Sequence, residues 1–327
     1  MGTKKQNTGL SIERAHRIAA AWQTATSMEE AMRMAGITAK DGRTLRRYRR
    51  MTEELLDTHL EPHNPHKSPL KRKHPRALSY DRHDEAFDVV VFSDAHWWPG
   101  MPTSPANDIL LQVIEEIQPA VIVDGGDSLD GASISRHPPN GWEHRPTLAD
   151  EIATVQSRLH DIHMASPGSE LYRMVGNHDL RFEMYLAQRA PEMREVVGTK
   201  ISDLFPGWEH TWSMYINDCV KIKHRWKSGI HASRNNAVGA GISHVTGHTH
   251  RLTCRAVSDE RGTHYGVETG TLADPHGDQF EYCEQTTVDW QPGFVVIHFW
   301  NDRHIVELVD VQDGSAFFRG EWWESRV

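Results

Sequence analysis

The chain has 327 residues, of which 38% are hydrophobic and 25% are charged, values that exclude wholesale disorder and collagen-like repeats. Its mean hydropathy is −0.60, and no stretch approaches the roughly 18 apolar residues that a membrane span requires, so we expect no membrane partner. The polar first residues lack an apolar signal segment and the three cysteines are too few for a disulfide framework, so we expect a cytoplasmic protein.

The charge is divided unevenly along the chain. Residues 1–77 contain 16 Lys and Arg against 8 Asp and Glu, a net charge of +8. Residues 78–327 contain 20 against 37, a net charge of −17. A basic segment in front of an acidic body suggests that the front contacts a polyanion and that the body binds cations.

The first 60 residues predict a small all-α module with helices over 9–24, 27–35 and about 41–60. Gly36 separates the second helix from the third, as in a helix-turn-helix. The alternative is a three-helix bundle whose basic face stays in solvent or contacts a partner protein. The candidate nucleic-acid contacts are the arginines of the third helix: Arg43, Arg46, Arg47, Arg49 and Arg50.

Residues 61–85 are predicted to be a basic linker, because four prolines and almost no apolar residues fill its first part, 61–77. The remaining residues, 86–327, are predicted to form one larger domain. Five apolar runs of strand length there each lead into a polar cluster: 89–92, 120–123, 171–175, 220–223 and 242–246.

Helical stretches at 105–117 and 147–164 lie between the early runs, so we expect a largely parallel sheet with its site at the carboxyl ends of the strands. Later strands are expected to form a second, more antiparallel sheet packed on the first: 253–257, 263–269, 293–299 and 304–311.

The polar side chains at the five strand ends form a mixed set of nitrogen and oxygen donors. Two carboxylates, one amide and four imidazoles suit Mn²⁺, Fe, Ni²⁺ or Zn²⁺ better than Ca²⁺ or Mg²⁺. Seven donors are too many for one tetrahedral ion and suit two ions that share a ligand. The predicted metal ligands are Asp94, His96, Asp127, Asn177, His224, His248 and His250.

The order of these motifs resembles the calcineurin-like metallophosphoesterase family. The resemblance covers roughly residues 86–275, and it implies an α/β fold, a four-layer α/β/β/α sandwich, here preceded by the helix-turn-helix-like domain. The motifs that carry it are Asp94-Ala-His96, Gly126-Asp-Ser-Leu-Asp130, Gly176-Asn-His-Asp179, a lone histidine and Gly247-His-Thr-His250.

The resemblance also implies roles for these residues. Two divalent ions, Mn²⁺ first and Fe, Ni or Zn as alternatives, would share a hydroxide that attacks phosphorus. His178 would protonate the leaving group or hold phosphoryl oxygens, and Asp130 would orient His178. Asp127 would bridge the ions, with Asp94, His96 and His250 on one and Asn177, His224 and His248 on the other.

Several assignments stay open. His231 rivals His224, because family members often have Gly after this histidine and here Arg225 follows it. Trp97, Trp98 and Trp226 can line the cleft or simply pack in loops. Candidate phosphate clamps, with surface ion pairing as the alternative, are Arg136, His137 and Arg181.

The resulting hypothesis is a metal-dependent phosphoesterase. Its substrate is DNA or RNA, as in nucleases of the family, or else a nucleotide, a small phosphoester or a phosphoprotein. A hypothesis of another class is a nucleic-acid-binding or assembly protein with an inert sandwich. The sequence leaves the metal, the mode of cleavage and the oligomeric state undetermined.

Overall fold

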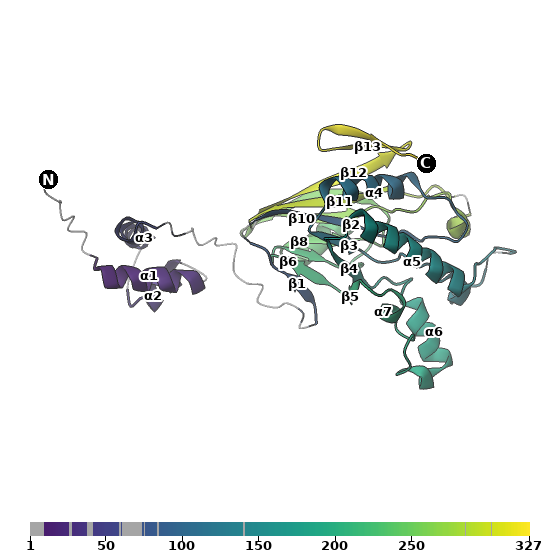
Figure 1. Cartoon of the computed structure of the whole chain (residues 1–327), viewed down its shortest axis with the longest axis horizontal. Coiled ribbons are helices and arrows are strands. Elements are labelled where there is room, and N and C mark those ends of the chain that lie inside the picture. Colours follow the sequence, from purple (N-terminus) through teal and green to yellow (C-terminus); the bar gives the residue numbers. More distant parts are fainter. Residues whose placement is uncertain are drawn as a thin grey trace. The chain divides into compact units, whose positions relative to one another are not determined.

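The computed structural model describes residues 10–25, 28–37, 42–58, 60, 74, 76–83, 85–139, 141–284, 286–301 and 303–327 (Figure 1). The chain divides into two compact units, with the division at Lys73 and His74. The predicted linker lies mostly outside the described residues, and its boundaries stay predictions. Among the described residues, no helix combines the length and apolar character needed to cross a membrane.

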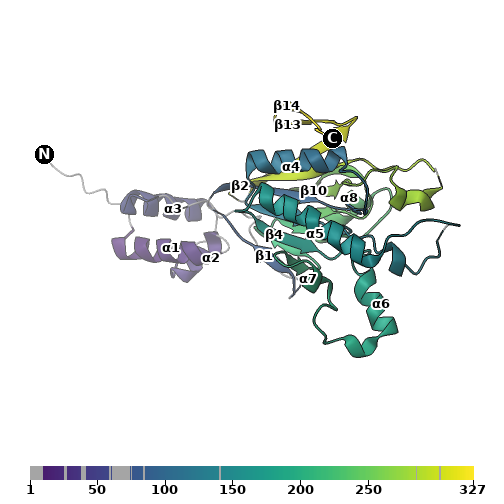
Figure 2. The ribbon, with the colours of Figure 1, turned by 45° about the vertical axis from the view of Figure 1, so that its right-hand side comes forward.

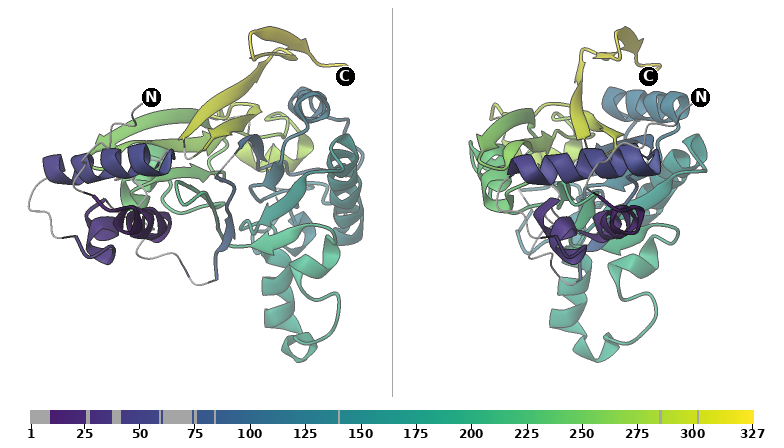
Figure 3. Two further views of the ribbon diagram at one scale, coloured as in Figure 1. Left: turned by 60° about the vertical axis from the view of Figure 1, so that its left-hand side comes forward. Right: turned by 90° about the vertical axis from the view of Figure 1, so that its left-hand side faces the viewer.

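The N-terminal unit contains three helices, α1 (Ile12–Thr24), α2 (Met28–Met34) and α3 (Gly42–Leu56), which pack on one another (Figure 3). Helix α1 begins where the Ser11 hydroxyl accepts a hydrogen bond from the Arg14 N–H. Ile18, Trp22 and Met32 are buried between the helices. Burial of each such side chain stabilises the unit by about 1.5–3 kcal/mol, so the three helices share a core of their own.

The first sheet of the larger unit has eight strands. Strands β2 to β5 are parallel, and β11 pairs antiparallel with β2, with Val295 opposite Val91. In spatial order the strands are β14 (Glu321–Glu324), β13 (Ser315–Phe318), β12 (Arg303–Gln312), β11 (Gly293–Trp300), β2 (Ala86–Phe92), β3 (Val121–Asp124), β4 (Glu170–Met174) and β5 (Glu209–Thr211).

The second sheet has six strands. Strands β7, β8 and β10 are parallel, whereas β6 runs antiparallel to β7. In spatial order they are β1 (Leu78–Tyr80), β6 (Met214–Ile216), β7 (Val220–Ile222), β8 (Ser243–Thr246), β10 (Gly262–Thr269) and β9 (Leu252–Asp259). Strand β1 falls inside the predicted linker.

Two buried cores hold the layers of this unit together. Val89 and Val91 of β2 point into a core between the two sheets, whereas Val90 and Phe92 point into a core beneath the helices. The long apolar run of β2 is therefore explained by burial on both faces. Helices α4 (Pro105–Ile117) and α5 (Leu148–Ala165) cover the eight-stranded sheet (Figure 2).

The outer face of the six-stranded sheet carries one short helix, α8 (Ala232–Ala240), which packs on β8 and β9. The prediction of an α/β fold with two packed sheets is confirmed. Helices α4 and α5 form one outer layer, the two sheets form the inner layers, and α8 is the helix described on the other outer face. The other elements are α6 (Arg181–Arg189), α7 (Ile201–Leu204) and three 3₁₀ helices at Ala132–Ile134, Pro191–Met193 and Asp278–Cys283.

The predicted assignment of strands to sheets is wrong in one respect. The strands after residue 251 do not form a sheet of their own: β11 and β12 extend the first sheet and β9 and β10 complete the second. Likewise β7 and β8 lie in the second sheet and not beside β4. The alternation of apolar and polar residues along a strand shows which of its faces is buried. It does not show which other strand pairs with it.

Candidate metal centre

The seven predicted ligands all follow strands that end at one edge of the two packed sheets. Strands β2, β3 and β4 belong to the first sheet, and β7 and β8 belong to the second. Because the sheets pack face to face, polar residues far apart in the sequence meet beyond the strand ends. In strand order they are Asp94 and His96, Asp127, Asn177, His224, and His248 and His250.

The first donor cluster contains Asp94, His96 and His250, with one ligand atom from each within 4.8 Å of the others. His250 Nε2 lies 3.3 Å from Asp94 Oδ1. His96 Nδ1 lies 3.0 Å from Asp130 Oδ1, so this nitrogen carries the proton that it donates to the carboxylate. His96 Nε2 is then a buried lone pair without a hydrogen-bond partner among the described residues, which fits a metal ligand.

The second donor cluster contains Asp127, His224 and His248, again with atoms within 4.8 Å. His224 Nδ1 donates to the Gly125 carbonyl at 2.9 Å, so its Nε2 faces Asp127 Oδ2 at 3.0 Å and Asn177 Oδ1 at 3.3 Å. Lone pairs of two oxygens and one nitrogen thus converge on one point. Such a convergence requires a positive charge among them, either a metal ion or a proton.

The pKa values of Asp127 and His224 reflect the same need for a positive charge between them. Burial opposes protonation of His224, but the charge and hydrogen bond of Asp127 outweigh it and raise the pKa of His224 to about 9. Burial also opposes ionisation of Asp127, yet His224 and His178 hold the pKa of that carboxyl well below its usual range. A proton on His224 therefore occupies the electrostatic role that a cation would take.

The backbone at the ligands is strained. Asp94, His96, Asp127, His248 and His250 all have positive φ angles, of 52°, 40°, 56°, 72° and 59°. This region is uncommon for residues with a side chain, and such conformations concentrate at functional sites. A side chain at Gly176 would collide with the Asp127 carboxylate, so glycine is required where β4 approaches the site.

A second histidine shares the carboxylate that orients His96. His178 Nδ1 lies 2.8 Å from Asp130 Oδ1, and Arg181 Nη1 donates to the Asp130 carbonyl at 2.8 Å. Arg181 Nη2 lies 3.4 Å from His178 Nε2. Burial opposes protonation of His178, but Asp127 and Asp130 together raise its pKa. The predicted pair His178 and Asp130 and the predicted clamp Arg181 are thus brought together beside the first cluster.

A buried ion network supports the turn after β3, which carries Asp127, and the turn after β4, which carries Asn177. The sequence analysis did not predict this network. Arg173, at 1% exposure, pairs with Asp124 at 2.6 Å and with Asp179 at 2.7 Å. Asp179 also accepts the N–H groups of Asp127 and Gly176, at 2.8 and 3.1 Å. The signal was present as charged residues within apolar strands, which are stable there only when paired.

Aromatic rings pack against the imidazoles. Trp290 lies 4.3 Å from His250 between ring centroids, and Phe280 lies 5.4 Å from His96. Trp97 and Trp98 are buried, as the alternative of packing expects. Trp97 packs beneath α4, where its Nε1 donates to Asn107 Oδ1 at 3.1 Å.

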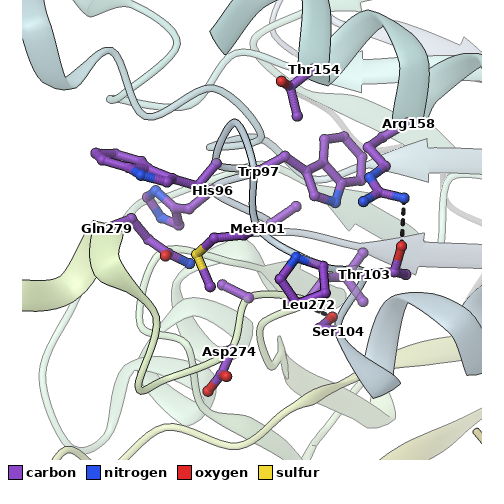
Figure 4. Close-up of a pocket in the computed structure, with 14 residues that line it drawn as sticks. His96, Trp97, Met101, Thr103, Ser104, Thr154, Arg158, Leu272, Asp274 and Gln279 are labelled. Carbon is purple, nitrogen blue, oxygen red and sulfur yellow. Dashed lines mark hydrogen bonds between the residues drawn. The ribbon is translucent and has the colours of Figure 1, made fainter. Parts of the chain in front are cut away.

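A small cavity of about 30 Å³ adjoins His96 and is lined by Trp97, Met101 and Gln279 (Figure 4). It has room for a water molecule and is too small for a phosphoester substrate. The Gln279 Oε1 atom is buried without a hydrogen-bond partner among the described residues, so a water there would satisfy it.

The other predicted site residues lie apart from the two clusters. His231 is exposed at the start of α8 and belongs to no donor cluster among the described residues, so the geometry favours His224. Arg136 and His137 are exposed in a loop where they contact each other.

The arginines of the N-terminal unit differ in environment. The side chains of Arg43 and Arg46 lie outside the described residues. Arg47 and Arg50 are exposed. Arg49 instead pairs with Glu53 at 3.2 Å and lies over the Trp22 ring, which makes it part of the helix packing.

No protein-family model matches the chain, and no curated protein matches it. Among solved structures, vacuolar protein sorting 29 from Cryptosporidium parvum is similar at 13% identity and a TM-score of 0.41, over 74% of this chain and 100% of that one. A single mutant of Vps29 from Entamoeba histolytica gives 13% and 0.42, over 72% and 98%. The Pseudomonas putida nuclease MPE gives 13% and 0.28, over 67% and 87%. With every TM-score below 0.5, we draw no functional conclusion from these likenesses.

Proposed function

We propose that the chain is a hydrolase that cleaves phosphoester bonds with two divalent metal ions. The observation that supports this is the pair of adjacent donor clusters, each of two imidazoles and a carboxylate, in which buried lone pairs converge. Two bound cations would polarise the phosphoryl group and lower the pKa of a water molecule.

The two clusters divide the ligands between the ions. Asp94, His96 and His250 would hold one ion, and Asn177, His224 and His248 the other. Asp127 is the candidate bridge, because it contacts His224 and its ionisation also responds to the charge of His96. Mixed imidazole and oxygen donors suit Mn²⁺, Fe, Ni or Zn, and Mn²⁺ is the ion proposed first.

His178 is the candidate general acid. Its Nδ1 is engaged by Asp130, which leaves Nε2 to present a proton to the leaving oxygen. Asp127 and Asp130 raise its pKa, which favours the protonated ring that a general acid requires. Arg181, beside Nε2, places a second positive charge where phosphoryl oxygens would lie.

The experiment that tests this function compares the purified full chain with and without added Mn²⁺. Hydrolysis is measured on a chromogenic phosphodiester, a phosphomonoester, and single- and double-stranded DNA. Metal-dependent turnover of the diester supports the proposal. Preference for the monoester would favour a phosphatase. Absence of both turnover and bound metal would favour the inert nucleic-acid-binding or assembly protein.

The N-terminal unit is proposed to contact DNA or RNA through α3, with a protein partner as the alternative. The exposed side chains of Arg47 and Arg50 support this proposal. Glutamate at both positions should weaken duplex DNA binding by the full chain, measured by a gel shift. Unchanged binding would favour the protein partner.

A further inference from the structure

A row of basic residues adjoins the candidate ligand His224. It consists of Lys221, Lys223, Arg225 and Lys227, which we call the basic strip. Its residues alternate with buried ones, since Val220, Ile222 and His224 point inward. Lys221 and Lys223 are half-buried and Arg225 and Lys227 are exposed, so all four side chains reach solvent next to the candidate ligand His224.

None of the four cations has a carboxylate within 4.0 Å among the described residues. Some other basic residues of this unit do, among them Arg173, Arg251 and Arg319, which each form ion pairs. The contrast is informative because residues 78–327 carry a net charge of −17, so carboxylates are abundant. Burial and the neighbouring Lys223 also lower the pKa of Lys221. A bound anion would relieve this crowding of like charges.

The strip is held in a fixed conformation. Lys227 N–H donates to Asn236 Oδ1 at 2.9 Å, and Asn236 Nδ2 donates to the Lys227 carbonyl at 3.1 Å. Trp226 packs against Gly239 of α8, where an added Cβ would lie 2.8 Å from the indole. A fixed arrangement loses little conformational entropy when a ligand binds.

Trp226 also keeps an aromatic surface within the strip. Its side chain is 46% exposed, and the ammonium groups of Lys221 and Lys227 lie 5.5 and 5.2 Å from its ring centroid. An exposed indole among cations is the combination that binds single strands, because bases stack on the ring while phosphates pair with the cations.

We propose that the basic strip binds the phosphate backbone of one nucleic-acid strand beside the metal centre. The inference that this strand is then cleaved rests on the proposed function. A small phosphoester would need one or two cations. Here the ammonium groups of Lys221 and Lys227 both lie within 5.5 Å of the Trp226 ring centroid, and Arg225, next to Trp226 in the chain, is exposed, so several cations lie around one aromatic ring. This arrangement suits a strand in which bases and phosphates alternate. A single strand suits this arrangement, because unpaired bases expose the faces that can stack on the Trp226 ring.

The test measures binding of a short fluorescent oligothymidylate to the full chain by anisotropy, without metal, over a range of NaCl concentrations. The variant Lys223→Gln/Arg225→Gln should bind at least about fivefold more weakly. Because each phosphate contact contributes about 0.7 to the salt slope for single strands, the slope should fall by about 1.4. The charge-conserving swap Lys223→Arg/Arg225→Lys should keep the wild-type slope.

The matched control is Arg255→Gln/Arg303→Gln, which removes two exposed charges of the same unit from β9 and β12. It should leave the affinity within about twofold of wild type and the salt slope unchanged, because neither residue belongs to the strip. Equal losses in this control, a wild-type slope in the glutamine variant, or a lost slope in the swap would each overturn the proposal. Binding as expected without any Mn²⁺-dependent diester hydrolysis would support the strip and refute only the proposed catalysis.

Discussion

Replacing Asp127 by asparagine should abolish metal binding while the fold survives. The two side chains have the same shape, and the asparagine carbonyl oxygen can still accept the N–H of His178, which lies 2.7 Å from Asp127 Oδ1. What is lost is the negative charge opposite His224, at 3.0 Å. Without this charge the site has one carboxylate, Asp94, for two dications.

The size of the effect follows from linkage. An ion that binds only the folded chain stabilises it by about 2.7 kcal/mol when its concentration is 100 times its Kd. For a unit of this size about 1 kcal/mol corresponds to roughly 2–4 °C in Tm. Saturating Mn²⁺ should therefore raise the Tm of the wild-type chain by roughly 5–11 °C, and that of Asp127→Asn by less than about 2 °C.

Calorimetry with and without Mn²⁺ measures this difference, and Asp313→Asn on the β12–β13 turn is a control that removes an exposed carboxylate. Histidine NMR without metal gives a second readout. His224, with a pKa of about 9, should be protonated at neutral pH in the wild type and neutral in the variant. A variant that keeps the wild-type Mn²⁺ shift and turnover would refute the bridging role of Asp127.

Three further outcomes are expected. His178→Gln should lower kcat about 100-fold for an alkyl leaving group and much less for p-nitrophenolate, because only the former needs the proton of His178; equal losses would contradict this role. Arg173→Met should destabilise the larger unit by about 3–5 kcal/mol in urea unfolding, because Asp124 and Asp179 lose their partner; a smaller loss would argue against the ion network. Burial lowers the pKa of His304 to about 4, so the unfolded chain binds a proton at this group at a higher pH than the folded chain does. The free energy of unfolding should therefore fall as the pH drops from about 6.5 toward 4, and His304 should account for about 2 kcal/mol of this fall at pH 5. His304→Gln should flatten that part of the profile.

The proximity of the candidate ligands was largely predictable because these residues obey a local rule. Each candidate ligand directly follows an apolar run, as His248 follows β8, and strands of a packed sheet end at a shared edge. The helices were predictable for a similar reason. Helix α4 begins at Ser104, whose side chain accepts the Asn107 N–H, and it occupies the predicted residues 105–117.

Features that depend on distant partners were not predictable. Strand β11 lies beside β2 because both faces of the pair are buried, and nothing within residues 293–299 shows this. The burial of Trp97 likewise depends on where α4 packs. The residues around Trp97 carry no local signal of this packing. Short strands such as β5 and β6, three residues each, carry too few alternations to be recognised.

The negative charge of the larger unit has opposite effects on the proposed metal ions and on a nucleic-acid substrate. A net charge of −17 concentrates divalent cations near the donor clusters and repels a polyanionic substrate from the same surface. The basic strip reconciles these effects, because it confines positive charge to one row that adjoins His224. Both effects weaken as salt rises, but a strand held by several cations loses affinity with a steep power of the salt concentration. Cleavage of a nucleic-acid strand should therefore be lost at salt concentrations at which a small diester, bound by the ions alone, is still hydrolysed.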